Sequence, residues 1–390
     1  MKVAIFSPEI GRTNGGKGQY AFYLLSHLCP LLYATGCQVH ILVAKDACLD
    51  GLAAQVRVFR LPVSKNTGTW RVVFEQVYSP FFSWGADVFL SLNSLFPLAP
   101  IHAARKLVVV HDIVQLQDTA QRQGSGGRIL SKSLLYGRIA MRKAISESDT
   151  IITVSQSVAA EVEAHFRVTR NRIVAIRHGL DHKRFHPVHD PVALEGVRKR
   201  YSLPPSFYLF VGPPHDGKKN LSLIARTYAQ FKGDDSVLLP VVIVGGERDS
   251  KINDQDSALI RDSAQTYLFR YLGFVPDEDL PLLYASARAL LHPAHHEGFG
   301  FPPLEAMGCG TPVVASDRAS IPEVVGNAAI LIDPCNPASL HEALHKVNEE
   351  SARASLIVMG LRRAQGFSWG GTAELMAEQI LQTGVSALVQ

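Results

Sequence analysis

Two glutamates, Glu297 and Glu305, lie in the part of the sequence whose residue types and spacing are best suited to chemistry. Seven residues separate them within the string HEGFGFPPLEAMGCGTPVVAS, residues 296–316. The proline pair in this string disfavours helix before it and suits a first helical turn, which predicts a helix that starts near Pro303. Glu297 would then lie on a loop and Glu305 in the first turn, so that both carboxylates can accept hydrogen bonds from hydroxyl groups of a ligand.

Glycines on both sides of this expected helix favour a ligand site at its N-terminus. Gly298 and Gly300 let the backbone approach a ligand closely, and Gly308 and Gly310 are expected to end the helix. Free N–H groups and the positive end of the helix dipole favour a phosphate at such a position. A purely structural explanation also exists, because the dipole alone favours glutamate in a first turn and Pro-Pro with glycine is common in turns.

A second polar loop, in the string VGPPHDGKKNLSLI (residues 211–224), contains two adjacent lysines. A strand ends here, a loop rich in proline and glycine follows, and a helix is expected to begin near Asn220. Lys218 and Lys219 therefore lie just before a helix N-terminus. The structural alternative is that a lysine pair on a loop is only solvated.

The first half of the chain holds two further candidate sites at strand ends. The loop TNGGKGQYAF follows the first strand and places Gly15, Gly16 and Gly18 before a helix, without the GxGxxG spacing of an NAD site. A tight strand-to-helix turn explains these glycines equally well. His111 and Asp112 end the apolar strand LVVVHD, and the carboxyl ends of parallel strands are where such sheets bind ligands. The alternative for His111 is a hydrogen-bonded strand end.

Three other polar motifs are interpreted as structural. Ser155, in TVSQS, is expected to cap a helix, and it is not interpreted as a nucleophile because it lacks the GxSxG context. His178, in HGLD, is expected to shape a turn near the domain junction. Two DxD strings, at residues 254–256 and 277–279, are expected to be solvated because neither directly ends a buried strand, so no metal site is predicted.

The composition describes a folded globular protein. Its 390 residues suffice for two domains with a core each, and 47% hydrophobic with 19% charged residues is unlike a disordered or fibrous chain. A net charge of +4 is too small to indicate a nucleic-acid partner. Five cysteines without a CxxC pair argue against a disulfide framework and fit a reducing cytosol, so we expect a cytoplasmic protein.

Short apolar runs alternate with helical patterns along almost the whole chain. Because the runs are rich in Val, Ile and Leu without alternation, the strands should be buried on both faces and mainly parallel. This order predicts doubly wound α/β domains. The expected strands are residues 3–7, 39–44, 56–61, 87–92, 106–110, 150–155, 172–177, 207–212, 240–245, 271–274, 289–292, 312–315 and 329–332.

A proline-rich run, residues 186–206, interrupts this pattern and predicts the domain junction. The order of elements begins again after it, which predicts two Rossmann-like halves, residues 1–190 and 200–367, that face each other across a cleft. A last amphipathic helix, within residues 368–390, is expected to pack back on the first half. The charge-free stretch 18–44 is interpreted as a buried helix, a turn and a strand, because its polar residues argue against a membrane span.

Residues 121–143 contain basic residues interleaved with apolar ones and no acidic residue. A basic amphipathic helix of this kind can lie on an anionic membrane surface. The alternative is a solvated helix face with its apolar side in the core. The basic residues are Arg122, Arg128, Lys132, Arg138, Arg142 and Lys143.

The string with the two glutamates resembles the donor-binding segment of the retaining glycosyltransferase family 4, which has the two-domain GT-B fold. The glycine-rich first loop, the HD pair, TVSQS, HGLD-x3-FHP, VGP-x5-KN and YLGFV-x7-LYASARALLHPA follow in family order, so the resemblance covers nearly the full chain. It implies transfer of a hexose from a nucleotide sugar with retention of configuration, without a cofactor or a metal ion. The acceptor hydroxyl would attack from the same face of the sugar from which the leaving group departs. The proton of this hydroxyl would pass to the departing phosphate.

The resemblance also implies roles for individual residues. Lys219 occupies the lysine that neutralises the leaving nucleoside diphosphate, and the family places a histidine such as His111 beside the donor sugar. Pro213 stands where many members have arginine, which leaves Lys218 and His215 as alternatives for the second phosphate partner. The residues assigned to catalysis are Glu297, Lys219 and His111, and those assigned to donor binding are Gly16, Lys218, Gly298, Phe299, Gly300 and Glu305.

The phrase EGFGFPPLEAM resembles bacterial mannosyl- and rhamnosyltransferases of polysaccharide assembly, so GDP-mannose is the first expected donor, with a UDP-sugar or dTDP-rhamnose as alternatives. The expected acceptor is a saccharide or a lipid-linked saccharide, with peripheral contact at the inner face of the cell membrane through residues 121–143. Two other classes share the architecture: a nucleotide-sugar 2-epimerase and a non-catalytic nucleotide-sugar-binding module. The glutamate pair in its proline–glycine context favours the transferase, and Lys219 beside it argues against the binding module.

Overall fold

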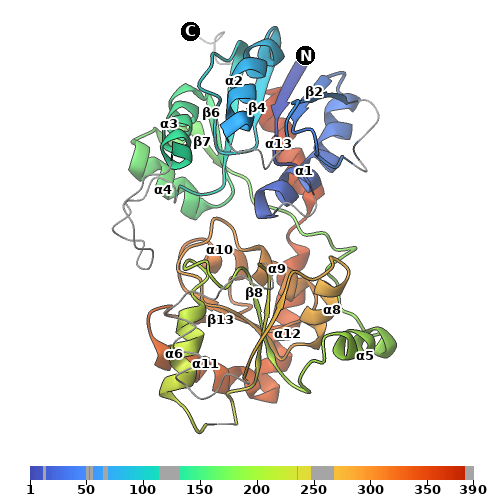
Figure 1. Ribbon diagram of the computed structural model, residues 1–390, viewed down its shortest axis with the longest axis vertical. Coiled ribbons are helices and arrows are strands. Elements are labelled where there is room, and N and C mark those ends of the chain that lie inside the picture. Colours follow the sequence, from blue (N-terminus) through green and yellow to red (C-terminus); the bar gives the residue numbers. More distant parts are fainter. Residues whose placement is uncertain are drawn as a thin grey trace. The chain divides into compact units, whose positions relative to one another are not determined.

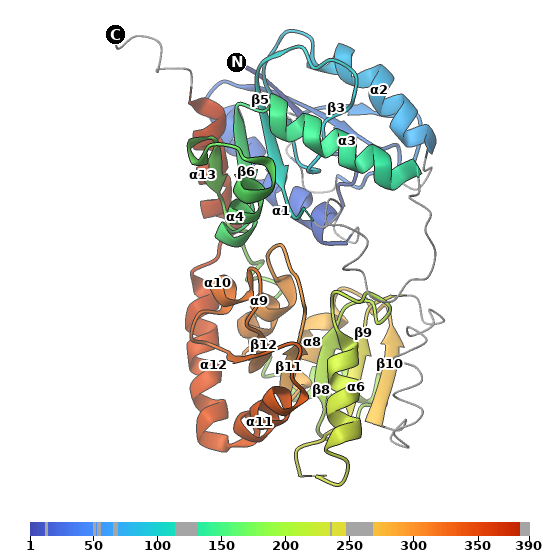
Figure 2. The ribbon, with the colours of Figure 1, turned by 90° about the vertical axis from the view of Figure 1, so that its left-hand side faces the viewer.

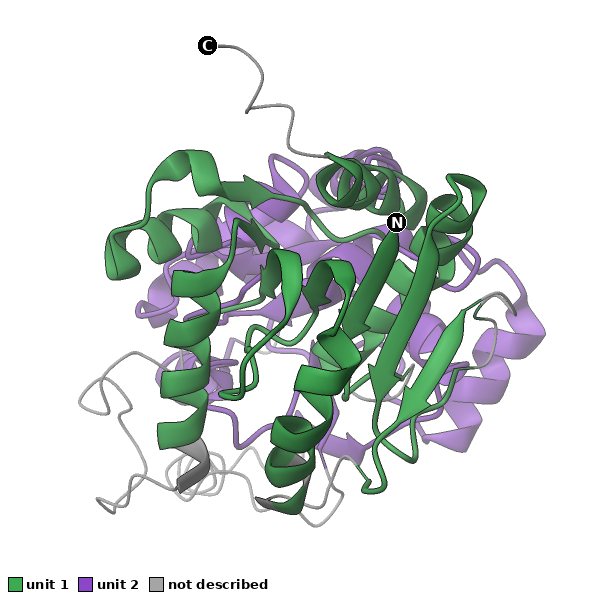
Figure 3. Cartoon of the chain, turned by 90° about the horizontal axis from the view of Figure 1, so that it is seen from above, with its two compact units in different colours: residues 1–121, 126–179, 368–390 green, residues 122–125, 180–367 purple. Residues whose placement is uncertain are grey.

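The computed structural model describes residues 1–11, 15–49, 52, 56–64, 69–113, 132–234, 236–246 and 268–382. The described residues divide into two compact units. Unit 1 holds those up to Gly179 and from Ser368 onward, and unit 2 is Leu180–Phe367 (Figure 3). The chain therefore crosses between the units at Gly179, upstream of the proline-rich run that was expected to hold the junction. Part of that run forms helix α5 (Pro191–Arg200), which Asp190 caps and Pro191 starts.

Unit 1 is built around a parallel sheet with the strand order β3-β2-β1-β4-β5-β6-β7 among the described residues (Figure 1). Its strands are β1 (Lys2–Phe6), β2 (Gln38–Val43), β3 (Arg57–Arg60), β4 (Ala86–Ser91), β5 (Ala103–Val110), β6 (Thr150–Thr153) and β7 (Ile173–Ala175). Its helices are α1 (Gly15–Ala34), α2 (Thr69–Ser83), α3 (Lys132–Glu147), α4 (Gln156–Phe166), a 3-10 turn (Arg170–Arg172) and α13 (Trp369–Leu381).

Unit 2 repeats the plan with the strand order β10-β9-β8-β11-β12-β13 in its described part. Its strands are β8 (Tyr208–Val211), β9 (Val241–Val244), β10 (Phe269–Gly273), β11 (Ala289–His292), β12 (Val313–Ser316) and β13 (Ile330–Ile332). Besides α5, its helices are α6 (Leu221–Gln230), α8 (Asp279–Ser286), α9 (Phe301–Gly308), α10 (Ile321–Val325), α11 (Pro337–Asn348) and α12 (Glu350–Gln365). Figure 2 shows α6 and α11 of this unit from a second direction.

The predicted α/β class is confirmed, because every strand expected from the sequence is present and every strand pairing among the described residues is parallel. In both units the first strand of the unit lies next to the fourth, β1 beside β4 and β8 beside β11. The strand order reverses at these pairs, and doubly wound sheets bind ligands outside the carboxyl ends of the strands at such a switch point. The loops that follow β8 and β11 therefore meet where a ligand is expected.

Several local predictions are also confirmed. The charge-free stretch forms α1 and β2, and no helix of the described residues is long and apolar enough to cross a membrane. The Ser155 side chain accepts a hydrogen bond from the Val158 N–H and caps α4. The last helix, α13, belongs to unit 1, where Trp369 stacks on Tyr23 of α1 with ring centroids 5.6 Å apart.

Two expectations are wrong. The helix after the glycine loop begins at Phe301 rather than near Pro303, so Glu305 lies in its second turn. In the second DxD string Asp279 is buried and not solvated, because Arg200 donates to both carboxylate oxygens at 2.6 and 2.7 Å and the Tyr201 hydroxyl donates at 2.6 Å. Asp277 of the same string pairs with Arg184 at 3.0 Å. The first DxD string, residues 254–256, lies outside the described residues.

Candidate active site

Lys219 reaches the carboxyl end of the unit 2 sheet across a glycine. Gly212 follows β8 with φ +149°, and a Cβ at this position would lie 3.1–3.3 Å from the Cγ, Cδ and Cε atoms of Lys219. Gly245, which follows β9, packs in turn on Gly212, since its own Cβ would lie 3.1 Å from the Gly212 carbonyl carbon. Small residues at both strand ends thus let the lysine stem lie flat against the backbone.

Asn220 fastens the loop of Lys219 to its neighbours. It is buried in a left-handed conformation (φ 58°, ψ 46°), and its Nδ2 donates to the carbonyls of Pro293 and Pro334, both at 2.9 Å. The backbone N–H of His295 also donates to the carbonyl of Lys218 at 2.8 Å. The loop after β8 and the loop after β11 are therefore held in one fixed arrangement.

Glu297 lies on the loop after β11, and its Oε1 forms an ion pair with Lys219 Nζ. The two side chains are only 16% and 17% exposed. His292, the last residue of β11, places Nε2 3.3 Å from the same oxygen. The Ser320 hydroxyl lies 2.9 Å from the Glu297 carbonyl and 2.8 Å from the Phe299 carbonyl, which holds the loop from the other side.

The electrostatics of this cluster favour an ionised carboxylate. Burial by itself would raise the pKa of Glu297, but Lys219 and His292 hold that pKa well below its usual range. Burial lowers the pKa of His292, although Glu297 opposes that change. A fixed negative charge therefore lies beside an ammonium group at the switch point of the sheet, where it can stabilise developing positive charge.

The second glutamate of the motif lies in a different environment. Glu305 is 6% exposed, and its Oε2 accepts a hydrogen bond from the Tyr284 hydroxyl at 2.9 Å. Burial raises the pKa of Glu305, with Arg184 and the Tyr284 hydrogen bond acting in the opposite sense. Its position in the second turn of α9 means that the dipole preference for glutamate in a first turn does not explain it.

The glycine loop before α9 is less rich in donors than expected. Gly300 takes φ +107° at the helix start, and a Cβ there would lie 2.8 Å from Ile321 Cδ1, so glycine is required. Of the first three helical residues only Phe301 has an N–H group, because Pro302 and Pro303 have none. The free N–H groups expected at this N-terminus are therefore limited to those of Gly300 and Phe301, with the N–H groups of the preceding loop beside them.

The remaining predicted residues of unit 2 differ in what they can offer a ligand. Phe299 is buried with its ring against Phe301 and Phe367, at 5.7 and 6.0 Å between centroids, so its side chain is part of the core and only its backbone can reach a donor. Lys218 is exposed, and its N–H donates to the Asp216 side chain at 3.1 Å.

The predicted residues of unit 1 are His111 and Gly16. His111 is buried, donates through Nε2 to the Leu92 carbonyl at 2.9 Å and packs against the edge of the Tyr20 ring. Burial, followed by the charge of Lys17, lowers the pKa of His111 to about 4, so the imidazole is neutral near pH 7. Gly16 is exposed in the first turn of α1.

His292, Ser320, Asn220 and Tyr284 were not singled out from the sequence. His292 could have been found by the rule that marked His111, because it too is a polar residue at the carboxyl end of a buried strand. The other three contact the site through hydrogen bonds across at least 21 positions of sequence, for which the local pattern carries no signal.

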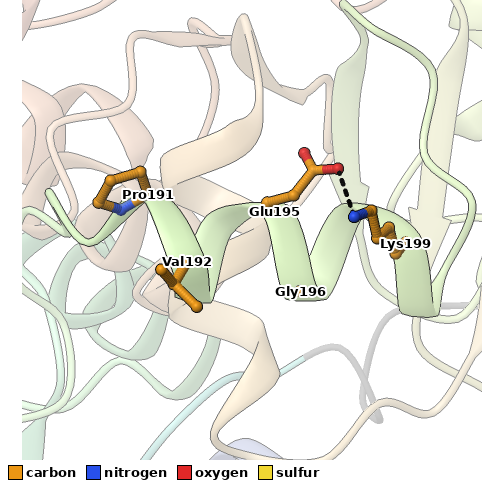
Figure 4. A pocket seen from close by; sticks show the side chains of 5 residues that line it. All are labelled: Pro191, Val192, Glu195, Gly196 and Lys199. Atoms are coloured by element: carbon orange, nitrogen blue, oxygen red, sulfur yellow. Dashed lines mark ion pairs between the residues drawn. The ribbon is translucent and has the colours of Figure 1, made fainter.

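A surface hollow of about 460 Å³ lies on α5, as Figure 4 shows. It is lined by Pro191, Val192, Gly196 and the ion pair of Glu195 with Lys199. None of the residues predicted for donor binding or catalysis lines it, and its only charges already neutralise each other. This hollow therefore does not mark the candidate active site.

Comparison with known proteins identifies this architecture as the GT-B fold of glycosyltransferases. The solved structure of WaaG, a glycosyltransferase involved in lipopolysaccharide biosynthesis, aligns over 98% of this chain and 100% of its own with a TM-score of 0.74 and 18% identity. The Anabaena protein HepE in complex with UDP-glucose aligns over the same shares with a TM-score of 0.71 and 18% identity.

Sequence relatives define the family more closely. The family description "Glycosyltransferase Family 4" matches residues 15–184, and "Glycosyl transferases group 1" matches residues 204–358. The O-antigen chain mannosyltransferase B of Escherichia coli is 31% identical over 275 residues, which are 69% of this chain and 68% of that protein. The chain belongs to glycosyltransferase family 4.

The ion pair predicts that Lys219 and its neighbour Lys218 respond differently to substitution. Lys219→Met should leave Glu297 without its buried cation and lower the free energy of unfolding by about 3 kcal/mol at pH 7, and should reduce turnover on the order of 100-fold. The exposed control Lys218→Met should change stability little. Urea unfolding and initial rates measure both effects.

The stability difference caused by Lys219→Met should also depend on pH. A depressed carboxylate pKa stabilises the fold above the unfolded value of 4.5, and this stabilisation is lost as pH falls through the folded value. The gap between wild type and Lys219→Met should therefore narrow below about pH 4.5. Equal, small effects of Lys218→Met and Lys219→Met on turnover and unfolding would contradict the assignment.

Proposed function

We propose that this glycosyltransferase transfers a hexose, with mannose from GDP-mannose as the first candidate, to a saccharide or lipid-linked saccharide with retention of anomeric configuration. The observation that carries the proposal is the Lys219–Glu297 ion pair at the β8–β11 switch point. Similarity to an O-antigen chain mannosyltransferase supports mannose as the sugar. HepE, whose structure contains UDP-glucose, supports a nucleotide sugar as the donor class.

In the proposed reaction Lys219 neutralises charge on the departing nucleoside diphosphate. When the diphosphate binds, its oxygens compete with Glu297 for the ammonium group, so the carboxylate gains freedom to hold a sugar hydroxyl. Its negative charge then favours the positive charge that develops at the anomeric carbon as the bond breaks. The acceptor hydroxyl attacks from the same face and its proton passes to the departing phosphate, so no protein general base is required.

We propose that no metal ion takes part in this step. Lys219 supplies the cation that a metal would supply at the diphosphate. Within the described residues, the carboxylates of Asp277 and Asp279 are already engaged by Arg184 and Arg200. The second phosphate partner, in place of the arginine that Pro213 replaces, is Lys218 or His215, both of which are exposed on the same loop.

The donor and the stereochemistry can be tested together. A thermal-shift panel of GDP, UDP, dTDP and ADP with their sugars should show the largest stabilisation with GDP-mannose, about 2.7 kcal/mol at 100 times the dissociation constant. The product formed with an acceptor should carry the same anomeric configuration as the donor by NMR. An inverted product, a preference for another nucleotide, or loss of turnover in EDTA would each contradict one part of the proposal. Donor incubated alone should yield no epimer.

Glu297 and Glu305 should affect different kinetic parameters. Glu297→Gln removes a charge whose benefit grows as the bond breaks, so it should lower turnover more than donor affinity. Glu305→Gln keeps an acceptor for Tyr284 while it weakens hydrogen bonds from the ribose, so it should mainly raise the donor dissociation constant. Donor titration and initial rates on both variants check this. A reversed pattern would exchange the roles, and unchanged parameters in both would show that the motif is structural.

A surface of unit 1 supports the proposed membrane contact, but from a different helix than expected. On α2 the exposed residues lie along one side of the helix and are mainly aromatic: Trp70, Val73, Val77, Tyr78 and Phe81, with Trp84 just beyond the helix end. The face that α2 buries is partly polar, with Glu75, Ser79 and Ser83. This orientation is the reverse of an ordinary surface helix and leaves an aromatic stripe outside.

Helix α3 extends this surface with positive charge. Gln76 of α2 donates to the Tyr136 hydroxyl of α3 at 3.1 Å, which joins the two helices (Figure 2). Helix α3 exposes Leu135 and Ile139, and the same helix carries basic residues. Of the predicted basic segment, Arg122 and Arg128 lie outside the described residues. Aromatic side chains beside basic ones suit the interface of an anionic bilayer, and we propose that lipid-linked acceptors are reached from it.

Substitutions on α2 test the membrane contact. The double variant Phe81→Ser, Trp84→Ser should lower the affinity for anionic vesicles at least tenfold. Burial of each aromatic side chain in the bilayer would otherwise contribute about 1.5–3 kcal/mol to the binding free energy. Arg138→Glu should weaken binding further. The matched control is Phe274→Ser, which removes a 76% exposed aromatic residue of unit 2. Vesicle co-sedimentation at low salt measures the effect, and wild-type protein that ignores such vesicles would end the proposal.

A further inference from the structure

Two histidines and an aspartate of unit 2 converge on one point away from the candidate active site. His341 and His345 lie one turn apart on α11, and Asp234 lies in the turn after α6. The Nε2 atoms of both histidines lie 3.0 Å from the same carboxylate oxygen, Asp234 Oδ2. In the described part of the chain, this is the group of three potential ligand atoms that lie within 4.8 Å of one another.

The turn that carries Asp234 is held by its own backbone. Gly233 takes φ +103°, the Asp234 N–H donates to the Phe231 carbonyl at 3.2 Å, and the Asp234 carbonyl accepts from the N–H groups of Val237 and Leu238 at 3.3 and 3.2 Å. The side chains of Val237 and Leu238 are buried in the core. The carboxylate therefore starts from a fixed backbone position.

Helix α11 is held just as firmly. Asn336 caps it by accepting from the Ala338 N–H at 3.0 Å, and its buried face packs Leu340 and Leu344 into the core. His341 and His345 follow these leucines by one position each, so both rings lie along the border of the buried face. The Phe231 ring stacks on His341, with centroids 3.9 Å apart and planes within 4°, and fixes the orientation of that imidazole.

The geometry is close to that of a zinc site. Zn²⁺ binds imidazole nitrogen and carboxylate oxygen at about 2.0–2.2 Å in a tetrahedral arrangement, which separates ligand atoms by about 3.4 Å. The observed 3.0 Å between each Nε2 and Oδ2 lies a few tenths of an ångström below this value, and all three ligand atoms lie within 4.8 Å of one another. The second carboxylate oxygen is already held by the Ser236 hydroxyl at 2.6 Å, as is typical of carboxylates that bind a metal ion.

We propose that Asp234, His341 and His345 bind a divalent transition-metal ion of the zinc class. Two imidazoles and one carboxylate suit Zn²⁺ and disfavour Mg²⁺ and Ca²⁺, which need more oxygen ligands. His345 is half exposed, so a water molecule can complete the fourth position and the ion can exchange with solvent. Metal binding replaces the two N–H donors to Asp234 with coordinate bonds from the Nε2 lone pairs, and each neutral imidazole then carries its single N–H on Nδ1.

The proposed metal site lies at the amino ends of the strands, and the candidate active site lies at their carboxyl ends. The turn after α6 leads into the amino end of β9, whereas Lys219 and Glu297 follow the carboxyl ends of β8 and β11. The ion would therefore join α6 to α11, which already meet through Thr227 and Pro337, and stabilise unit 2 without contact with the donor.

Calorimetric titration of the chelator-stripped full chain with ZnCl2 tests the proposal. The exposed thiols Cys48 and Cys335 are first removed by Cys48→Ser and Cys335→Ser, because free thiolates also bind zinc. In this background the protein should bind one equivalent. Loss of a residue that only hydrogen-bonds to a metal ligand weakens metal binding about 10–100-fold. His345→Gln or Asp234→Asn removes a ligand itself and should weaken zinc binding by more than that. The control His165→Gln, on an exposed position of α4, should bind like its parent.

Two further readouts separate a built site from loose binding. Co²⁺ should give the intense visible absorption of a tetrahedral complex in the parent and in His165→Gln but not in His345→Gln, and Zn²⁺ should raise the unfolding temperature of the same two proteins only. His345→Gln should keep its transferase turnover. No zinc binding at micromolar concentration, or equal affinity in all variants, would overturn the proposal.

Discussion

The buried ion pair between Lys219 and Glu297 is the interaction on which the candidate active site depends. Removing two charges from water costs several kcal/mol for each ion, and their attraction offsets that cost only when the geometry is held tightly. Here the strands β8 and β11 are neighbours in the sheet, so the loops that follow them lie at the same end of the strands. Asn220 then joins the loop after β8 to the loop after β11 through Pro293 and to the loop after β13 through Pro334, which holds the two charges in place.

This pair also prepares the site for a charged ligand. In the proposed reaction the ammonium group is already held in place before a diphosphate arrives, so little reorganisation would be needed when phosphate oxygens replace the carboxylate as its partner. Glu305 is kept apart from this exchange because it is buried against Tyr284 in the second turn of α9. Two glutamates of one motif therefore have opposite electrostatic environments, with the pKa of Glu297 lowered and that of Glu305 raised.

The two ends of the strands in the unit 2 sheet differ in the groups that they present to a ligand. Glycines and charged loops lie at the carboxyl ends of the strands, where helix starts and strand ends leave backbone groups available to a ligand. Tight turns lie at the amino ends of the strands, and there Asp234 and the two histidines of α11 form a compact polar cluster. In unit 1, the exposed aromatic stripe of α2 adds a third kind of surface. One architecture repeated twice thus supports different interactions, which follow from the loops and helix faces and not from the sheets.

Much of this protein could be predicted from the sequence, because uninterrupted apolar runs, capping residues and proline–glycine loops act over a few residues. They were sufficient for the strands of both sheets, the parallel α/β class and the positions of Lys219 just before a helix and Glu297 on a loop. Contacts across the chain were not predictable: Asp234 meets His341 over 107 positions, and the buried Asp279 is paired with Arg200 and Tyr201 over 79 and 78 positions. Likewise the pattern of α2 shows that one face is aromatic but not which face is buried. Tertiary packing decides that, since burial depends on neighbours that local sequence does not encode.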